Sequence, residues 1–119
     1  MTTVAFFRAA DQSLVGFEAS GHTGFAEAGE DIVCAAVSAL TEATLNGLRS
    51  VVKAPLMFDR NEKNALLTAC LTPECTRETL EKAQILLQTL LEAVQAIAGE
   101  YPRNVRIIFK ERRKYACSE

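Results

Sequence analysis

The chain contains short stretches with a two-residue hydrophobic period, one long apolar stretch and one long stretch with a helical period. Val4, Phe6 and Arg8 alternate with Ala5 and Phe7, and a second alternating run over residues 15–19 follows a polar turn, which predicts a β-hairpin. A second hairpin is predicted from residues 53–59 and 64–71, which are also joined by a polar turn. Residues 105–109 alternate once more and predict a final strand.

Two segments favour helices. Residues 32–48 are rich in Ala, Val and Leu, and Asp31 stands before them as a candidate N-cap, so a largely buried helix is expected there. A second helix is expected to begin near Thr72 and Pro73 and to stop at Gly99. Its apolar residues recur at three- and four-residue steps and form one stripe, namely Leu80, Ala83, Leu87, Leu90, Val94 and Ile97.

The predicted element order is therefore ββαββαβ. It indicates an α+β fold in which a mixed or antiparallel sheet packs against two main helices. Residues 20–31 follow neither period and contain three glycines, so they are expected to form a loop. With 119 residues and no internal linker, the whole span 1–119 is expected to be a single domain.

Composition narrows the classes of function. The formal net charge of −2 argues against broad phosphate neutralisation, so nucleic-acid binding is not expected, although Lys110, Arg112, Arg113 and Lys114 form a local basic patch. The chain has no apolar run long enough to cross a bilayer and no signal-peptide pattern at its start. We therefore expect a cytoplasmic protein without a membrane partner.

Four cysteines, at positions 34, 70, 75 and 117, are expected to be free thiols because the cytoplasm is reducing. The sequence has no C-x-x-C motif and a single histidine, so neither a zinc site nor any other metal site is predicted.

The chemistry concentrates at the start of the first helix. If Asp31 caps that helix, Cys34 falls in its first turn, where the unpaired amides and the positive end of the helix dipole favour a thiolate. The same amides could stabilise an oxyanion. His22, the sole histidine, lies twelve residues upstream and could serve as the base. Ser38 shares a helix face with Cys34, where it could line a substrate groove.

These signals also have structural interpretations. A cysteine in an Ala/Val-rich helix is commonly a core residue, and a lone loop histidine is commonly incidental. Asp31 could cap the helix or orient His22, and the cap is the favoured role. Taken together, the capped helix, the first-turn thiol and the sole histidine make a catalytic dyad of Cys34 and His22 a contender.

The segments 21–26 (GHTGFA) and 29–38 (GEDIVCAAVS) closely resemble the signature of the ribosomal-processing cysteine proteases, the bacterial Prp family. They share the glycine-histidine step, the G-x-D-I-V-C-A core and the spacing from histidine to cysteine. Thr23 is a departure, since alanine or another small residue is expected there.

The resemblance implies a cysteine endopeptidase that removes the short N-terminal extension of a bacterial large-subunit ribosomal protein, cutting after a motif with paired phenylalanines. It implies His22 as base and Cys34 as nucleophile, with Gly21, Asp31 and Ser38 near the site. It also implies a homodimer without metal or cofactor.

Two other classes of function stay open. A ribosome- or RNA-associated binding module is suggested by the basic tail and by an element order that recurs in RNA-binding folds. A thiol redox protein would need a reversible disulfide between Cys34 and a partner cysteine, and the missing C-x-x-C motif disfavours it.

Overall fold

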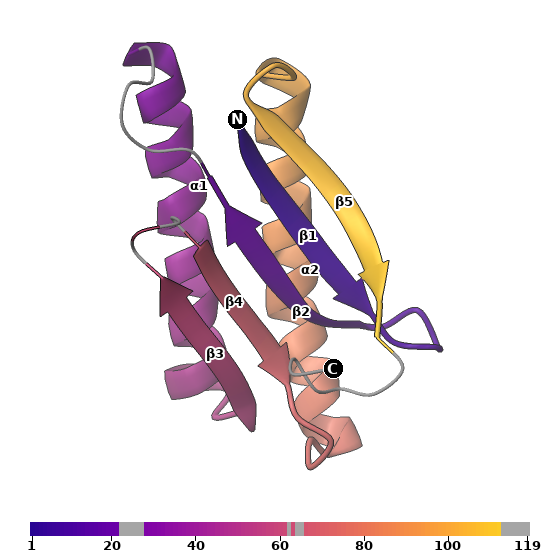
Figure 1. Cartoon of the computed structure of the whole chain (residues 1–119). Helices are drawn as coiled ribbons and strands as arrows, with labels where there is room; N and C mark the ends of the chain where they lie inside the picture. Colours follow the sequence, from indigo (N-terminus) through magenta and orange to yellow (C-terminus); the bar gives the residue numbers. More distant parts are fainter. Residues whose placement is uncertain (22–27, 62, 64–65, 113–119) are drawn as a thin grey trace.

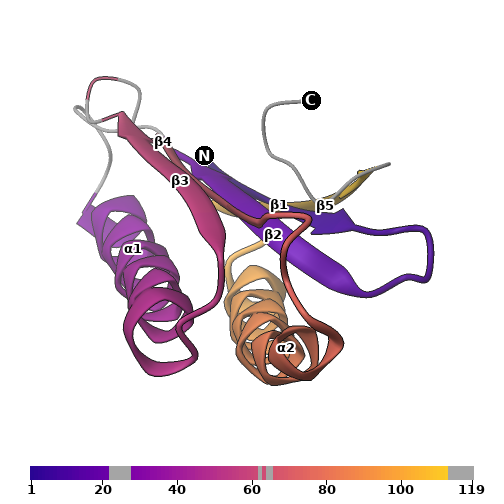
Figure 2. The same ribbon diagram turned by 90° about the horizontal axis from the view of Figure 1, so that it is seen from below.

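Five strands form one mixed sheet, and two long helices cover one of its faces (Figure 1, Figure 2). The computed structural model describes residues 1–21, 28–61, 63 and 66–112. The strands are β1 (Thr2–Arg8), β2 (Leu14–Ser20), β3 (Leu56–Asn61), β4 (Leu66–Leu71) and β5 (Val105–Glu111). The helices are α1 (Ala28–Asn46), which continues directly into a π-helical turn (Gly47–Val51), and α2 (Arg77–Glu100). The predicted α+β class, the ββαββαβ order and the mixed sheet are confirmed.

The strand order across the sheet is β3-β4-β2-β1-β5. Both predicted hairpins form, because β1 pairs antiparallel with β2 and β3 pairs antiparallel with β4. The two hairpins join through antiparallel pairing of β2 with β4. Strand β5 returns after α2 and adds parallel to β1, with Val105 opposite Thr2. The connection through α2 supplies the long crossover that a parallel pair requires.

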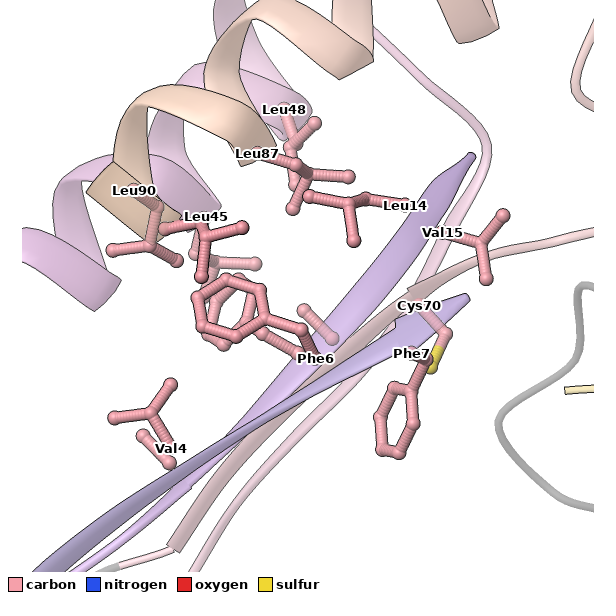
Figure 3. Packing of buried hydrophobic residues seen from close by; sticks show 14 of the residues in the cluster. Val4, Phe6, Phe7, Leu14, Val15, Leu45, Leu48, Cys70, Leu87 and Leu90 are labelled. Carbon is pink, nitrogen blue, oxygen red and sulfur yellow. The ribbon is translucent and has the colours of Figure 1, made fainter. Parts of the chain in front are cut away.

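The core lies between the sheet and the helices. Alternate residues of β1, among them Val4 and Phe6, point toward α1 and α2 and are fully buried (Figure 3). The predicted α2 stripe faces them, and five of its residues are buried, namely Leu80, Ala83, Leu87, Leu90 and Val94. On the other side of the strands, Phe7, Val15 and Cys70 point away from the helices (Figure 3). The helical period therefore identified the inward face of α2 correctly, whereas the period of the second strand did not hold throughout, because the β1–β2 register shifts between Phe7 and Arg8 and Val15 points outward.

Both predicted helix starts need correction. The first helix begins at Ala28, so Asp31 lies inside its first turn and is not the N-cap. Alanine is the best helix former, and acidic residues in a first turn favour the positive end of the helix dipole, so the helix extends upstream of Asp31. The second helix is capped by Thr76, whose side chain accepts a hydrogen bond from the Thr79 amide, and not by Thr72. The backbone carbonyl of Thr72 instead accepts the Cys75 amide in the preceding turn.

Gly16 of β2 pairs with Cys70 of β4. A Cβ built at this position would stand 2.8 Å from the Cys70 Sγ and 2.9 Å from the Cys70 Cα. Glycine is therefore the residue that lets these two strands pair at this point.

Within the part of the chain that the structure describes, neither helix is both long enough and apolar enough to span a bilayer.

Candidate active site

A pocket of about 280 Å³ opens beside α1, at the end of the sheet where β1 begins and β2 ends. The hairpin of β3 and β4 forms the other side of the pocket, through the end of β3 and the start of β4. We call this cavity the Cys34 pocket. Its lining residues are Thr2, Ala19, Ser20, Gly21, Cys34, Val37, Ser38, Thr41, Glu42, Arg60, Asn61, Leu66 and Leu67.

Cys34 reaches this pocket from the second turn of α1. Its side chain is half-buried and is a free thiol. Because the helix begins at Ala28, the amides without an intrahelical acceptor belong to positions no later than 31. The predicted position of Cys34 in the first turn, among unpaired amides, is therefore wrong. The dipole effect falls off within the first turn, so it is not what distinguishes Cys34.

One side chain that contacts Cys34 was missed by the sequence argument. Thr2 Oγ1 lies 3.1 Å from Cys34 Sγ, and either atom can be the donor. Thr2 shares the inward face of β1 with Val4 and Phe6, yet it carries a hydroxyl and is only 4% exposed. Thr2 could have been found from the sequence, because it is a polar residue two positions before Val4 and so shares a strand face with Val4 and Phe6. The predicted strand began at residue 4 and so excluded it.

Two of the predicted supporting residues line the pocket with Cys34. Ser38 follows Cys34 by one helical turn and is exposed, which agrees with the predicted shared face. Gly21 lies at the end of β2, next to Thr2. Thr41 also lines the pocket, but its hydroxyl donates to the backbone carbonyl oxygen of Val37 at 3.0 Å and contacts that of Ser38 at 3.1 Å, so it is engaged by the helix itself.

The predicted base, His22, lies outside the described residues, as do the neighbouring loop positions through residue 27. Asp31 belongs to α1 by its backbone. The structure therefore brings together Cys34, Ser38 and Gly21, which immediately precedes His22 in the sequence.

An ion pair closes one side of the Cys34 pocket. Arg60 on β3 donates to Glu42 on α1 through Nη2 at 2.6 Å and through Nε at 3.0 Å. The apolar wall comes from Ala19, Val37 and the two leucines that open β4. A pocket with this lining can accept an apolar side chain next to a thiol, with charge confined to one side.

The other cysteines differ from Cys34. Cys70 is disulfide-bonded, so the expectation of a free thiol is wrong for this residue. Cys75 is a free thiol, and burial raises the pKa of the Cys75 thiol above its ordinary value. Among the described residues, no group of three or more His, Cys, Asp and Glu side chains could hold a metal ion.

The basic patch is partly engaged by the fold. Lys110 Nζ lies 3.8 Å from Glu18 Oε2, and the Arg112 guanidinium lies 4.0 Å above the centre of the Phe7 ring. Arg113 and Lys114 lie outside the described residues. The two described members of the patch thus have partners within the sheet, which weakens the RNA-binding interpretation.

Comparison with known proteins decides the family. Residues 1–106 match the family model described as cysteine protease Prp. The chain belongs to the Prp family of cysteine proteases. A Prp relative, the ribosomal processing cysteine protease of Bacillus subtilis (strain 168), is 28% identical over 100 residues, which cover 84% of this chain and 89% of that protein. The Prp of Staphylococcus aureus is 30% identical over 92 residues, which cover 76% and 81% of the two chains.

Solved structures agree with this assignment. A crystal structure of a Streptococcus mutans protein has a TM-score of 0.80 and 28% identity, covering 94% of this chain and 96% of that one. The essential ribosomal processing protease Prp of S. aureus with a covalently linked product peptide has a TM-score of 0.76 and 25% identity, covering 92% and 100%. The predicted family and the predicted class of enzyme, a cysteine protease, are confirmed.

Proposed function

We propose that this chain is the endopeptidase that removes the short N-terminal extension of a bacterial large-subunit (50S) ribosomal protein. Its Prp relatives are named as ribosomal processing proteases, and that name supports a ribosomal substrate here. The observation that carries the proposal is the position of the Cys34 thiol in the wall of an apolar pocket that also includes Gly21, the residue before His22.

Cys34 is the proposed nucleophile and His22 the proposed base. His22 takes the proton from the Cys34 thiol, and the thiolate attacks the scissile carbonyl carbon. The tetrahedral intermediate collapses to a thioester as the amine leaves with the proton that His22 returns. Water, deprotonated by His22, then hydrolyses the thioester and regenerates the thiol. No metal or cofactor is needed for any of these steps.

The lining of the Cys34 pocket supports an apolar residue next to the cut. Ala19, Val37, Leu66 and Leu67 provide an apolar wall close to the thiol. A phenylalanine side chain gains free energy by leaving water for such a surface. We therefore propose that the chain cuts after paired phenylalanines, as the family resemblance implies.

Three residues are proposed to support the dyad. Ser38, one turn after Cys34, lines the pocket beside the thiol-bearing residue. Gly21 leaves room beside Thr2, where a side chain would be crowded. Since α1 begins at Ala28 and excludes Asp31 as its cap, we assign Asp31 the other role that its sequence position allows, which is orienting His22.

We propose further that residues 1–119 form one cysteine protease domain that works as a homodimer in the cytoplasm. The family match over residues 1–106 supports the single domain. The homodimer is what the resemblance to the Prp family implies. Light scattering coupled to size-exclusion chromatography gives the mass and so tests the dimer.

The experiment that tests the proposed activity is mass spectrometry of the extended ribosomal protein from the same genome after incubation with this protein. We expect one cleavage that frees the N-terminal extension. Cys34→Ala and His22→Ala are both expected to abolish the cleavage. Cys75→Ala is the matched control, because it removes a free thiol that does not line the Cys34 pocket.

A precursor that stays intact with the wild-type protein would contradict the proposal. Cleavage that survives in Cys34→Ala would assign the reaction to another nucleophile. Cleavage that is lost equally in Cys75→Ala would mean that any cysteine replacement inactivates the protein, so the dyad would lose its support.

A further inference from the structure

Thr2 places a hydroxyl on the inward face of β1, where the next two residues along that face are apolar. Residues two apart on a strand share a face, so Thr2 points the same way as Val4 and Phe6, which are fully buried. Thr2 itself is buried as well. A buried hydroxyl without a partner is unfavourable, so the atom that Thr2 Oγ1 contacts matters for this site.

That partner is the thiol of Cys34. The two atoms are 3.1 Å apart, and they belong to residues separated by 32 positions in the chain. With a neutral thiol, either group can donate the proton. Once Cys34 is ionised, its sulfur can only accept, so the Thr2 hydroxyl must donate. A hydrogen bond to the ionised form stabilises that form, and charge-assisted bonds are the stronger ones.

The Thr2 hydroxyl is also held in place by the fold. The Thr2 amide donates to the carbonyl oxygen of Asn104 at 2.8 Å, and Thr2 pairs with Val105 of β5. On the other side, a Cβ at Gly21 would stand 3.2 Å from Thr2 Oγ1 and 3.7 Å from Thr2 Cγ2. Gly21 therefore packs closely against Thr2 without displacing it. The hydroxyl is fixed before substrate arrives, which is the condition for preorganised stabilisation.

We propose that Thr2 is a positioning residue for Cys34, which donates a hydrogen bond to the thiolate and holds its sulfur toward the pocket. This inference rests on the proposed function of Cys34 as nucleophile. It adds a residue from β1 to a site that the sequence assigns to the segment 21–38. Thr2 does not touch the scissile bond in this role, since it acts through the sulfur.

The test is the rate of Cys34 alkylation by iodoacetamide across a range of pH, followed by mass spectrometry of the labelled peptide. Thr2→Val keeps the shape of the side chain and removes the donor. We expect the half-maximal rate to move to higher pH and the rate near neutrality to fall about tenfold, which corresponds to about 1.4 kcal/mol. Thr2→Ser restores the hydroxyl and is expected to restore the profile.

Thr3→Val is the matched control. It makes the same substitution one position along β1, on the opposite face of the sheet, and is expected to leave the profile unchanged. Peptide cleavage is measured in parallel, and Thr2→Val is expected to lower kcat with little change in KM. Thermal unfolding checks that each variant is folded. If Thr2→Val does not fold, Thr2→Ala is compared with Thr2→Ser in the same way.

The outcomes separate this inference from the proposed function. An unchanged profile in Thr2→Val, with cleavage by the wild-type protein intact, overturns the inference alone. A shifted profile that Thr2→Ser does not restore also overturns it, because the hydroxyl is then not responsible. A shifted profile that Thr2→Ser restores supports the role of Thr2 at the sulfur. This support holds even if the wild-type protein leaves the ribosomal precursor uncut, a result that would contradict only the proposed function.

Discussion

Arg60 on β3 and Glu42 on α1 are joined by two hydrogen bonds, of 2.6 and 3.0 Å, at the side of the pocket that contains Cys34. The pair links the outer hairpin to the helix that carries the thiol. Both side chains are 42% exposed, so solvent screens their attraction. The pair is therefore expected to matter more for the shape of the pocket than for the stability of the fold.

A double-mutant cycle of Glu42→Gln and Arg60→Gln tests this expectation. The coupling in the free energy of unfolding is expected to be about 0.2–1 kcal/mol, the range for exposed pairs. For peptide cleavage, each single variant is expected to raise KM and to leave kcat nearly unchanged, because a wall of the pocket loses its anchor. Lys110→Gln is the control, since it removes an ion pair with Glu18 outside the pocket. An equal rise of KM in Lys110→Gln would contradict the role of the Arg60–Glu42 pair.

Gly16→Ala is expected to destabilise the protein. The new Cβ would meet Cys70 Sγ at 2.8 Å and Cys70 Cα at 2.9 Å, which forces β2 away from β4. Overpacking of this kind costs about 1–3 kcal/mol in the free energy of unfolding, measured by chemical denaturation. Gly99→Ala is the matched control, because nothing lies within 4 Å of its added Cβ and its position is helical. It is expected to stabilise the protein by about 0.5–1 kcal/mol, and a loss of stability there would count against this explanation.

The two free thiols should react differently. Burial raises the pKa of the Cys75 thiol, so less of it is ionised at any pH below that value, and its alkylation in the folded protein should be slow. We expect Cys34 to be labelled before Cys75 near neutral pH in a time course read by mass spectrometry. In denaturant, the labelling of Cys75 should accelerate, because its desolvation is lost. Equal rates for the two thiols in the folded protein would mean that Cys34 is not activated.

Asp11 supplies a pH-dependent test in the turn between β1 and β2. The Ser13 hydroxyl donates to Asp11 Oδ1 at 2.6 Å and the Ser13 amide donates at 3.0 Å, and these bonds hold the pKa of the Asp11 carboxyl below its ordinary value. Ser13→Ala removes the first bond, so the pKa of Asp11 should rise part of the way toward that value. Carboxyl carbon NMR during an acid titration measures this change.

The sign of the accompanying stability change follows from the lowered pKa. A carboxyl with a lowered folded pKa contributes stability above its unfolded pKa and loses it as the pH falls through the folded value. The wild-type protein should therefore gain less from this turn in strong acid than near neutrality, and Ser13→Ala should narrow that difference. An unmoved titration midpoint in Ser13→Ala would show that the hydroxyl is not the cause.

The sequence was informative wherever a hydrophobic period decided the structure. Both hairpins and the inward stripe of α2 followed from the spacing of apolar residues, because burial of one face fixes the register, whereas the first helix followed from its richness in Ala, Val and Leu. Helix starts were less predictable. Asp31 and Thr72 are both good cap residues, but the caps depend on where the backbone turns, and helix ends are weakly specified by propensity.

The site was predictable only in part. The thiol of Cys34 and its relation to Ser38 followed from helical spacing, whereas the contact between Thr2 and Cys34 depends on which strand packs beside α1. That contact joins two residues separated by 32 positions, and no local pattern encodes it. The parallel position of β5 was missed for the same reason, since strand order is a property of the whole sheet.

The parallel pairing of β5 with β1 also sets when the site can form during synthesis. Thr2 leaves the ribosome well before its strand partner Val105 and before Asn104, whose carbonyl accepts its amide, because both come much later in the chain. A nascent chain that lacks β5 leaves one edge of β1 unpaired and Thr2 without that anchor. The Cys34 thiol thus meets an anchored Thr2 only after β5 has left the ribosome. An incomplete nascent chain is therefore not expected to cut the newly made proteins around it.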